Sequence, residues 1–159
     1  LKKITIEKTI EYSSDLTGLK ATWLDLQPSN QGNLPLISEK MKNVIVENLI
    51  GNEQITWLPI SIDYGPESRI YYLPYFNFSD NIVDINRCII SKASIAITYF
   101  QTIKFFDEKI KKYSIFPTPN VDPQNKVHIT GFIFINEKLK KALVKNKITG
   151  IKFYPFDNS

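Results

Sequence analysis

Apolar and polar residues alternate along several short stretches of the chain, which is the pattern of half-buried β-strands. In residues 2–12, Ile4, Ile6, Ile10 and Tyr12 fall on one face, with Lys and Glu between them. Comparable patterns predict further strands over residues 22–26, 55–63, 70–78, 82–90, 94–105, 127–135 and 151–155. Stretches that contain Pro and Gly predict a turn at 65–66 and loops at 27–35 and 107–125, the second loop with a short extended piece at 113–116.

Two other segments repeat their apolar residues at the spacing of an amphipathic helix. The first begins after Ser38 and ends near Asn48 or Gly51, and the second begins after Asn136. Ser and Asn are favoured before a helix because the side-chain oxygen accepts a hydrogen bond from a backbone N–H group of the first turn. The residues expected to face inwards are Met41, Val44, Ile45 and Leu49 in the first helix, and Leu139, Leu143 and Val144 in the second.

These elements predict an α+β fold in which two capped helices pack on a mostly antiparallel sheet. At 159 residues, of which 43% are hydrophobic, the chain is long enough to form a single domain over residues 1–159 without disulfides or metals. Pro59 cannot donate to a strand ladder, so its strand is expected to be an edge or to be interrupted there. The residues expected to be buried are Ile4, Ile6, Leu49, Trp57, Phe132, Phe134 and Leu143.

The net charge of +4 does not by itself indicate a nucleic-acid partner. Arg69 and Arg87 are the two arginines among 20 basic residues, whereas nucleic-acid surfaces favour Arg, which makes bidentate contacts with phosphate and guanine. The lysines are scattered among acids and form no basic stripe. No apolar run approaches the roughly 18 residues of a membrane span. We therefore expect no nucleic-acid partner and no membrane insertion.

Residues with catalytic or cofactor chemistry are sparse. The sequence has no Gly-rich phosphate loop, and His128 is its one histidine, so we expect no cofactor and no metal site. Cys88 is the single cysteine, which excludes an internal disulfide. A thiolate pair of Cys88 and His128, oriented by Asp84 or Asp122, is one catalytic hypothesis. A structural cysteine and an ordinary histidine explain the same residues more simply.

A pair of carboxylates is the second catalytic hypothesis, because two such groups can act as general acid and base. The candidate pairs are Asp80 with Asp84, and Asp107 with Glu108. Turn and surface acids are the simpler interpretation of both pairs. The sequence therefore predicts a protein that is not an enzyme.

The richest feature is the aromatic run at residues 70–78. One set of its side chains should belong to the core. The other set, which includes Tyr71 and Tyr75, has three open interpretations: burial under a helix, a surface for a protein partner, or stacking of single-stranded nucleic acid. Tyr and Arg are common anchors of protein interfaces. The second interpretation places a partner-binding site at Tyr64, Arg69, Tyr71 and Tyr75.

Several short motifs also occur in a familiar order. They are Trp23-Leu24-Asp25, Pro35-Leu36-Ile37-Ser38-Glu39-Lys40, Trp57-Leu58-Pro59-Ile60, Tyr71-Tyr72-Leu73, Val83-Asp84-Ile85-Asn86-Arg87, Asn136-Glu137-Lys138-Leu139-Lys140-Lys141-Ala142-Leu143 and Thr149-Gly150-Ile151-Lys152-Phe153. Over residues 22–155 the chain thereby resembles the predicted immunity proteins of bacterial polymorphic-toxin systems. The resemblance is to the immunity protein 43 family and the related immunity protein 11 group.

The resemblance implies a cytoplasmic antidote that binds a cognate secreted toxin, blocks its active site or fixes its shape, and has no catalytic residues of its own. Because inhibitors of basic nucleases are usually acidic, the net charge of +4 favours a toxin of another kind. Two other classes remain open. One is a structural or envelope-associated binding domain of a bacterial assembly, and the other is an enzyme with a sparse site at Cys88 and His128.

Overall fold

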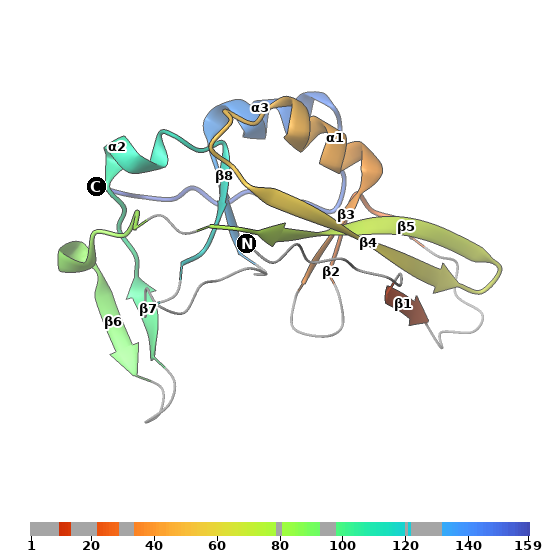
Figure 1. The fold of residues 1–159 in the computed structure, drawn as a ribbon, viewed down its shortest axis with the longest axis horizontal. Helices are drawn as coiled ribbons and strands as arrows, with labels where there is room; N and C mark the ends of the chain where they lie inside the picture. Colours follow the sequence, from red (N-terminus) through yellow and green to blue (C-terminus); the bar gives the residue numbers. More distant parts are fainter. Residues whose placement is uncertain are drawn as a thin grey trace.

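The longest elements of the structure are two ten-residue strands, β4 (Ile55–Tyr64) and β5 (Glu67–Phe76), which form a hairpin (Figure 1). The computed structural model describes residues 10–13, 22–28, 34–78, 81–92, 98–119, 121 and 132–159. Gly65, with a φ of 57°, and Pro66 make the hairpin turn. This order suits a two-residue turn, because Gly adopts positive φ without strain and Pro fixes the next φ near about −65°. The predicted strands and turn are confirmed.

β4 and β5 lie at the centre of a five-stranded sheet with the order β1-β4-β5-β3-β2. β1 pairs parallel with β4, and the other neighbours pair antiparallel. The remaining three strands are β1 (Ile10–Ser13), β2 (Leu26–Pro28) and β3 (Pro35–Ser38). β4 continues through Pro59, so an interruption there is wrong, and at Pro59 itself the one described partner strand is β5. Pro59 pairs with Tyr72 of β5 and precedes the described pairing with β1, which begins at Ile60.

The region around β2 and β3 also differs from prediction. Residues 22–25 are not a strand, β2 extends from Leu26 into the loop predicted at 27–35, and β3 begins at the end of that loop and runs to Ser38, the cap of the first helix. β3 pairs with β5 through Ile37 and Tyr72, and β2 pairs with β3 through Leu26 and Ile37. The prolines around these strands favour a loop locally, and the distant partner β5 outweighs that preference.

The described residues also form two small antiparallel sheets, β6–β7 and β8–β9, so the predicted α+β fold with mostly antiparallel sheet is confirmed. Their bounds are β6 (Ile89–Lys92), β7 (Thr98–Thr102), β8 (Ile115–Pro117) and β9 (Ile133–Ile135). The predicted strand at 82–90 is largely wrong. The N–H groups of Arg87 and Cys88 bond locally to the carbonyls of Asp84 and Ile85, which gives the 3₁₀ helix η1 (Ile85–Arg87).

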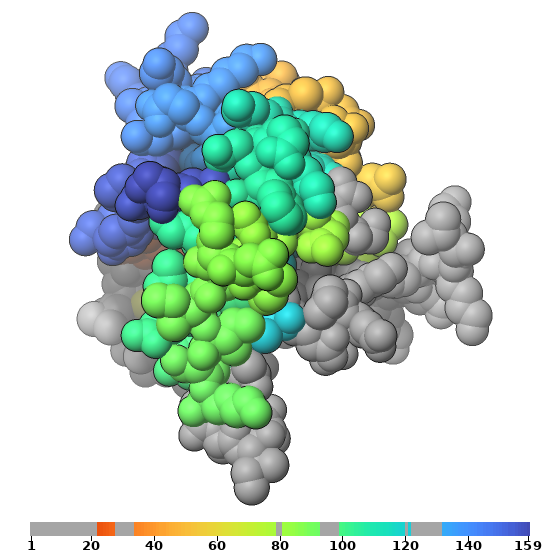
Figure 2. Space-filling model, turned by 90° about the vertical axis from the view of Figure 1, so that its left-hand side faces the viewer, coloured from red at the N-terminus to blue at the C-terminus, as the bar shows by residue number. Residues whose placement is uncertain are grey.

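The end of the chain is extended, but the strand predicted at 151–155 is absent. Instead, the last residues lie beside η1 and β6, as the dark blue and light green atoms of Figure 2 show. Arg87 Nη2 donates a hydrogen bond to the Asn158 carbonyl at 2.6 Å. A short helix, α2 (Asp107–Ile110), occupies part of the loop predicted at 107–125, and β8 corresponds to its expected extended piece.

The two capped helices, α1 (Glu39–Glu47) and α3 (Glu137–Lys145), are confirmed. Ser38 Oγ accepts a hydrogen bond from the Met41 N–H at 3.1 Å, and Asn136 Oδ1 accepts one from the Leu139 N–H at 2.8 Å. The helices lie side by side on one face of the five-stranded sheet (Figure 1). Each cap satisfies a backbone donor that would otherwise lack a partner, and so fixes where the helix begins.

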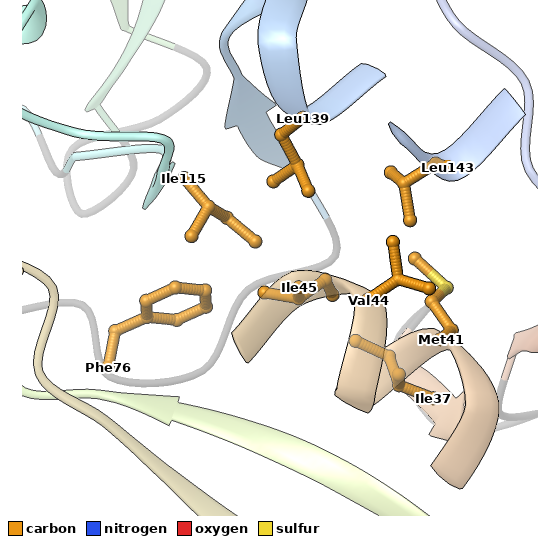
Figure 3. Close-up of a cluster of buried hydrophobic side chains, with 8 residues drawn as sticks. All are labelled: Ile37, Met41, Val44, Ile45, Phe76, Ile115, Leu139 and Leu143. Carbon is orange, nitrogen blue, oxygen red and sulfur yellow. The ribbon is translucent and has the colours of Figure 1, made fainter. Parts of the chain in front are cut away.

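The main core lies between these helices, β5 and β8. Figure 3 shows Leu139 and Leu143 of α3 directed towards α1, with Phe76 and Ile115 beside them. The full cluster contains Ile37, Met41, Val44, Ile45, Phe76, Ile115, Leu139 and Leu143. The prediction of a buried Leu143 is confirmed, and Leu49, Trp57 and Phe134 are partly buried against core clusters.

Two predictions about the core are wrong. Phe132 is 75% exposed, because β9 begins only at Ile133 and the strand alternation does not extend to residue 132. Val144 is 59% exposed, because Leu139 and Leu143 already define the buried stripe of α3 and the next residue points about 100° away from it. Ile4 and Ile6 lie outside the described residues.

Candidate functional site

The four residues predicted to bind a partner share one face of the sheet. Directly paired residues in β4 and β5 point to the same side, and successive residues alternate. The pairs Tyr64–Glu67, Ile62–Arg69, Ile60–Tyr71 and Thr56–Tyr75 therefore lie on a common face. The alternate residues, such as Phe76, join the core under α1 and α3. The predicted site thus lies on the side of the sheet away from those helices.

Trp23, which precedes β2, contacts three of the four predicted residues and also Glu67. Its ring stacks on Tyr71, with centroids 6.2 Å apart and planes inclined by 25°, and it makes a T-shaped contact with Tyr64, with centroids 6.5 Å apart. The guanidinium carbon of Arg69 lies 4.7 Å from the centroid of the Trp23 ring, and Trp23 Nε1 donates a hydrogen bond to Glu67 Oε2 at 2.6 Å. We call Trp23, Tyr64, Glu67, Arg69 and Tyr71 the Trp23 cluster.

Tyr71 forms the base of this cluster and is only 2% exposed, so a role as an exposed interface anchor is wrong for it. It is buried under residues 22–25, which we call the Trp23 segment, and not under a helix. Its hydroxyl donates to the Leu24 carbonyl at 2.6 Å, and it packs with Leu36, Ile60 and Leu73. Burial raises the pKa of Tyr71 above its ordinary value. Tyr71 therefore supports the surface from below.

Arg69 and Glu67 form the exposed part of the cluster. Their side chains are 53% and 55% exposed, and the nearest charged atoms, Arg69 Nη2 and Glu67 Oε2, are 3.9 Å apart. An exposed pair at this distance contributes little to stability. Trp23 and Tyr64 are half-buried beside them. The cluster therefore presents one cation, one carboxylate and two half-buried aromatic rings above a buried tyrosine.

Tyr75 does not join the cluster. It lies four residues along β5 from Tyr71, a distance of about 13 Å on an extended strand, and it pairs with Thr56. The structure thus brings together three of the four predicted residues and adds Trp23 and Glu67. Sequence reasoning assigned no binding role to Trp23, although Trp23 belongs to the first motif of the family resemblance. No local signal pointed to Glu67.

Asp25 holds the Trp23 segment in place. Its carboxylate accepts hydrogen bonds from Ser38 Oγ at 2.7 Å and from the Thr149 N–H at 2.9 Å, and Lys40 Nζ lies at 3.7 Å. The Asp25 carbonyl also accepts from the Ser38 N–H at 2.8 Å. Burial would raise the pKa of Asp25, but the hydrogen bonds and the Lys40 charge outweigh it and lower the pKa below its ordinary value. One carboxylate therefore connects the site to the start of α1 and to the loop after α3.

The residues of the thiolate hypothesis are only partly described. Cys88 Sγ lies at the end of η1 and exchanges hydrogen bonds with backbone groups, donating to the Asp84 carbonyl at 3.2 Å and accepting from the Lys104 N–H at 3.3 Å. His128 and Asp122 lie outside the described residues. Within the described ranges, no three His, Cys, Asp or Glu side chains are close enough together to hold a metal ion.

The residues of the carboxylate hypothesis are also only partly described. Asp80 lies outside the described residues, and Asp107 and Glu108 are exposed on α2. Asp107 Oδ1 accepts a hydrogen bond from Asn158 Nδ2 at 2.7 Å, so it helps to hold the end of the chain. Asp84 lies before η1 and uses its backbone carbonyl to accept from Arg87. These contacts are structural.

A small pocket lies beside Glu53, between the loop that follows α1 and the region before β8. Its polar lining includes Asn52, Gln54 and Asn77. The Glu53 carboxylate accepts hydrogen bonds from the Gly51 N–H at 2.9 Å and from the Ser114 N–H. Burial would raise the pKa of Glu53, but these backbone donors outweigh it and lower the pKa. Glu53 therefore joins two loops, and its role in the pocket is structural.

Comparison of the chain with protein-family models, curated proteins and solved structures finds no match. Function is therefore inferred from the residues of the site. Trp, Tyr and Arg are the residues that most often dominate the binding energy of protein interfaces, and the Trp23 cluster contains all three. In the described part of the chain, no helix is long and apolar enough to cross a membrane.

Proposed function

We propose that this chain is a protein-binding module that acts as an immunity protein, binding a cognate bacterial toxin in the cytoplasm and blocking its activity. The resemblance over residues 22–155 indicates the class of partner. The observation that carries the proposal is the Trp23 cluster, in which Arg69 lies on an aromatic base at the tip of the β4–β5 hairpin. In this proposal the chain neutralises the toxin by binding alone.

The order within the cluster supports a role in tight binding. Trp23 is held by Tyr71 on its face, by Tyr64 at its edge and by Glu67 at its indole nitrogen. A side chain that is already fixed loses little conformational entropy when a partner binds. An antidote needs high affinity because small amounts of free toxin are harmful, and a pre-ordered surface of this composition is well suited to it.

The test uses the toxin domain encoded beside the gene for this chain. Co-expression should restore growth of a bacterial host that produces the toxin, and calorimetry should detect a tight complex of the purified proteins. Tyr64→Ala should weaken this complex about tenfold or more, as is typical for an interface tyrosine. Tyr99→Ala is the matched control, because Tyr99 is an exposed tyrosine on β7, away from the hairpin tip. A toxin that stays lethal and forms no complex would refute the proposed function.

A further inference from the structure

We propose that Arg69 binds a carboxylate of the partner protein, and that Glu67 competes with that carboxylate while holding Trp23 in position. This inference rests on the proposed function and names the chemistry of the group that the site recognises. Arg is suited to this role because its planar guanidinium offers five N–H donors, which match the two oxygens of a carboxylate.

The position of Arg69 leaves those donors available. A guanidinium that lies over an aromatic ring uses its face for that contact, while its N–H donors lie in its own plane. The guanidinium carbon of Arg69 lies 4.7 Å from the centroid of the Trp23 ring, within the range of a cation–π contact. Its side chain is exposed, so a partner can reach the donors. Trp23 therefore holds Arg69 through a cation–π contact and offers its N–H donors no oxygen acceptor.

Glu67 does not satisfy Arg69. Charge-assisted N–H···O hydrogen bonds are about 2.7–2.9 Å long, whereas Arg69 Nη2 and Glu67 Oε2 are 3.9 Å apart. The same Glu67 oxygen accepts the Trp23 N–H at 2.6 Å. Within the described part of the chain, Glu67 is the one carboxylate within 4 Å of the Arg69 guanidinium. A better-placed carboxylate from outside would complete the coordination of Arg69.

The surrounding charges favour a protein carboxylate over a nucleic-acid phosphate. Between residues 55 and 76 the hairpin carries one cation, Arg69, and two acids, Asp63 and Glu67. Polyanions are normally bound by several Lys and Arg side chains together. A single Arg among aromatic residues instead matches the pattern of a protein interface anchor. The partner surface that faces the Trp23 cluster is therefore acidic at one defined position.

The test measures the dissociation constant of the complex with the neighbouring toxin domain, at low and at high salt. Arg69→Ala should weaken binding at least about 30-fold, which is the lower range for losing one partner of a buried charge pair. Arg69→Lys should recover little of this loss, because Lys keeps the charge but lacks the planar fork. Arg87→Ala is the matched control and should change affinity less than about threefold, since Arg87 lies on η1, at the other end of the molecule (Figure 1).

Two further variants separate the roles of the cluster. Glu67→Gln keeps an acceptor for Trp23 Nε1 but removes the competing charge, so it should tighten binding by about threefold. Among Asp→Asn and Glu→Gln substitutions in the toxin domain, one should weaken binding to the unmodified chain but not to the Arg69→Ala variant. Circular dichroism melting of every variant establishes that the fold is retained.

Opposite results would overturn the inference and leave the proposed function standing. If Glu67→Gln weakens binding and Arg69→Ala does not, Glu67 itself contacts a basic group of the partner. If Arg69→Lys and the unmodified chain bind with equal affinity, Arg69 contributes only its positive charge and not its planar set of donors. A short, fluorescently labelled single-stranded oligonucleotide is the second probe. If it binds the unmodified chain and Arg69→Ala abolishes that binding, Arg69 contacts a nucleic-acid phosphate and not a protein carboxylate. If the toxin domain does not bind the unmodified chain at all, this inference and the proposed function both fail.

Discussion

Replacing Gly150 by alanine should destabilise the protein much more than the same change at Gly65. Both glycines have positive φ values, 78° at Gly150 and 57° at Gly65, which L-amino acids adopt only with strain. An added Cβ at Gly65 meets no atom within 4 Å. At Gly150 it would lie 2.3 Å from the Leu26 carbonyl oxygen and 2.9 Å from Leu24 Cβ. The two positions therefore share the backbone strain and differ in the available space.

The expected magnitudes follow from these contacts. Placing a non-Gly residue in the left-handed region costs about 1–2 kcal/mol, and the lower entropy of the unfolded alanine chain offsets about 0.4–1 kcal/mol of that. Gly65→Ala should therefore cost about 1 kcal/mol. The clash at Gly150 adds the cost of overpacking, about 1–3 kcal/mol. The Leu26 carbonyl cannot easily move away, because the neighbouring Leu26 N–H donates to the Thr149 carbonyl at 3.1 Å.

Urea unfolding followed by far-UV circular dichroism gives the free energy of unfolding of both variants. We expect Gly150→Ala to be about 2 kcal/mol less stable than Gly65→Ala, which corresponds to a melting temperature roughly 4–8 °C lower for a chain of this size. Loss of the same stability in both variants would show that residue 150 does not approach β2 this closely. The close packing of Gly150 against Leu24 and Leu26 would then not be what holds the Trp23 segment in place.

The free energy of unfolding should also depend on Asp25 and Tyr71, but only weakly on Cys88. Asp25→Asn should cost roughly 1–3 kcal/mol near neutral pH. Because folding lowers the Asp25 pKa, the carboxylate contributes its full stabilisation above the pKa of the unfolded state, about 3.9, and this stabilisation is lost as the pH falls through the pKa of the folded state. Urea unfolding near pH 7 and near pH 3 checks this, and an undiminished cost in acid would contradict it. Tyr71→Ala should cost about 3–5 kcal/mol and Tyr71→Phe about 1–3 kcal/mol, since the partly buried Leu24 carbonyl loses its donor. A stable Tyr71→Ala variant that only binds more weakly would show that Tyr71 belongs to the interface. Cys88→Ser should keep toxin neutralisation at a packing cost of about 1 kcal/mol, and a folded but inactive variant would support the catalytic pair with His128.

Some features of this protein could be predicted from the sequence because the chemistry that causes them is local. The starts of α1 and α3 depend on Ser38 and Asn136, each of which bonds an N–H group three residues further on. The β4–β5 hairpin depends on two adjacent turn residues and on strand alternation. The same alternation correctly placed Tyr71 and Tyr75 on one face, since the side-chain period of a strand is two residues.

Tertiary structure decided which of those residues is buried and which is exposed. Tyr71 is buried and Arg69 is exposed because the segment at Trp23, 44 positions before Glu67, lies across the hairpin. That segment is held by the bond between Asp25 and Thr149, which are 124 positions apart. The pairing of β3 with β5 also joins distant residues. Such contacts depend on where the chain returns in space, and neither the spacing nor the composition of a short window specifies that return.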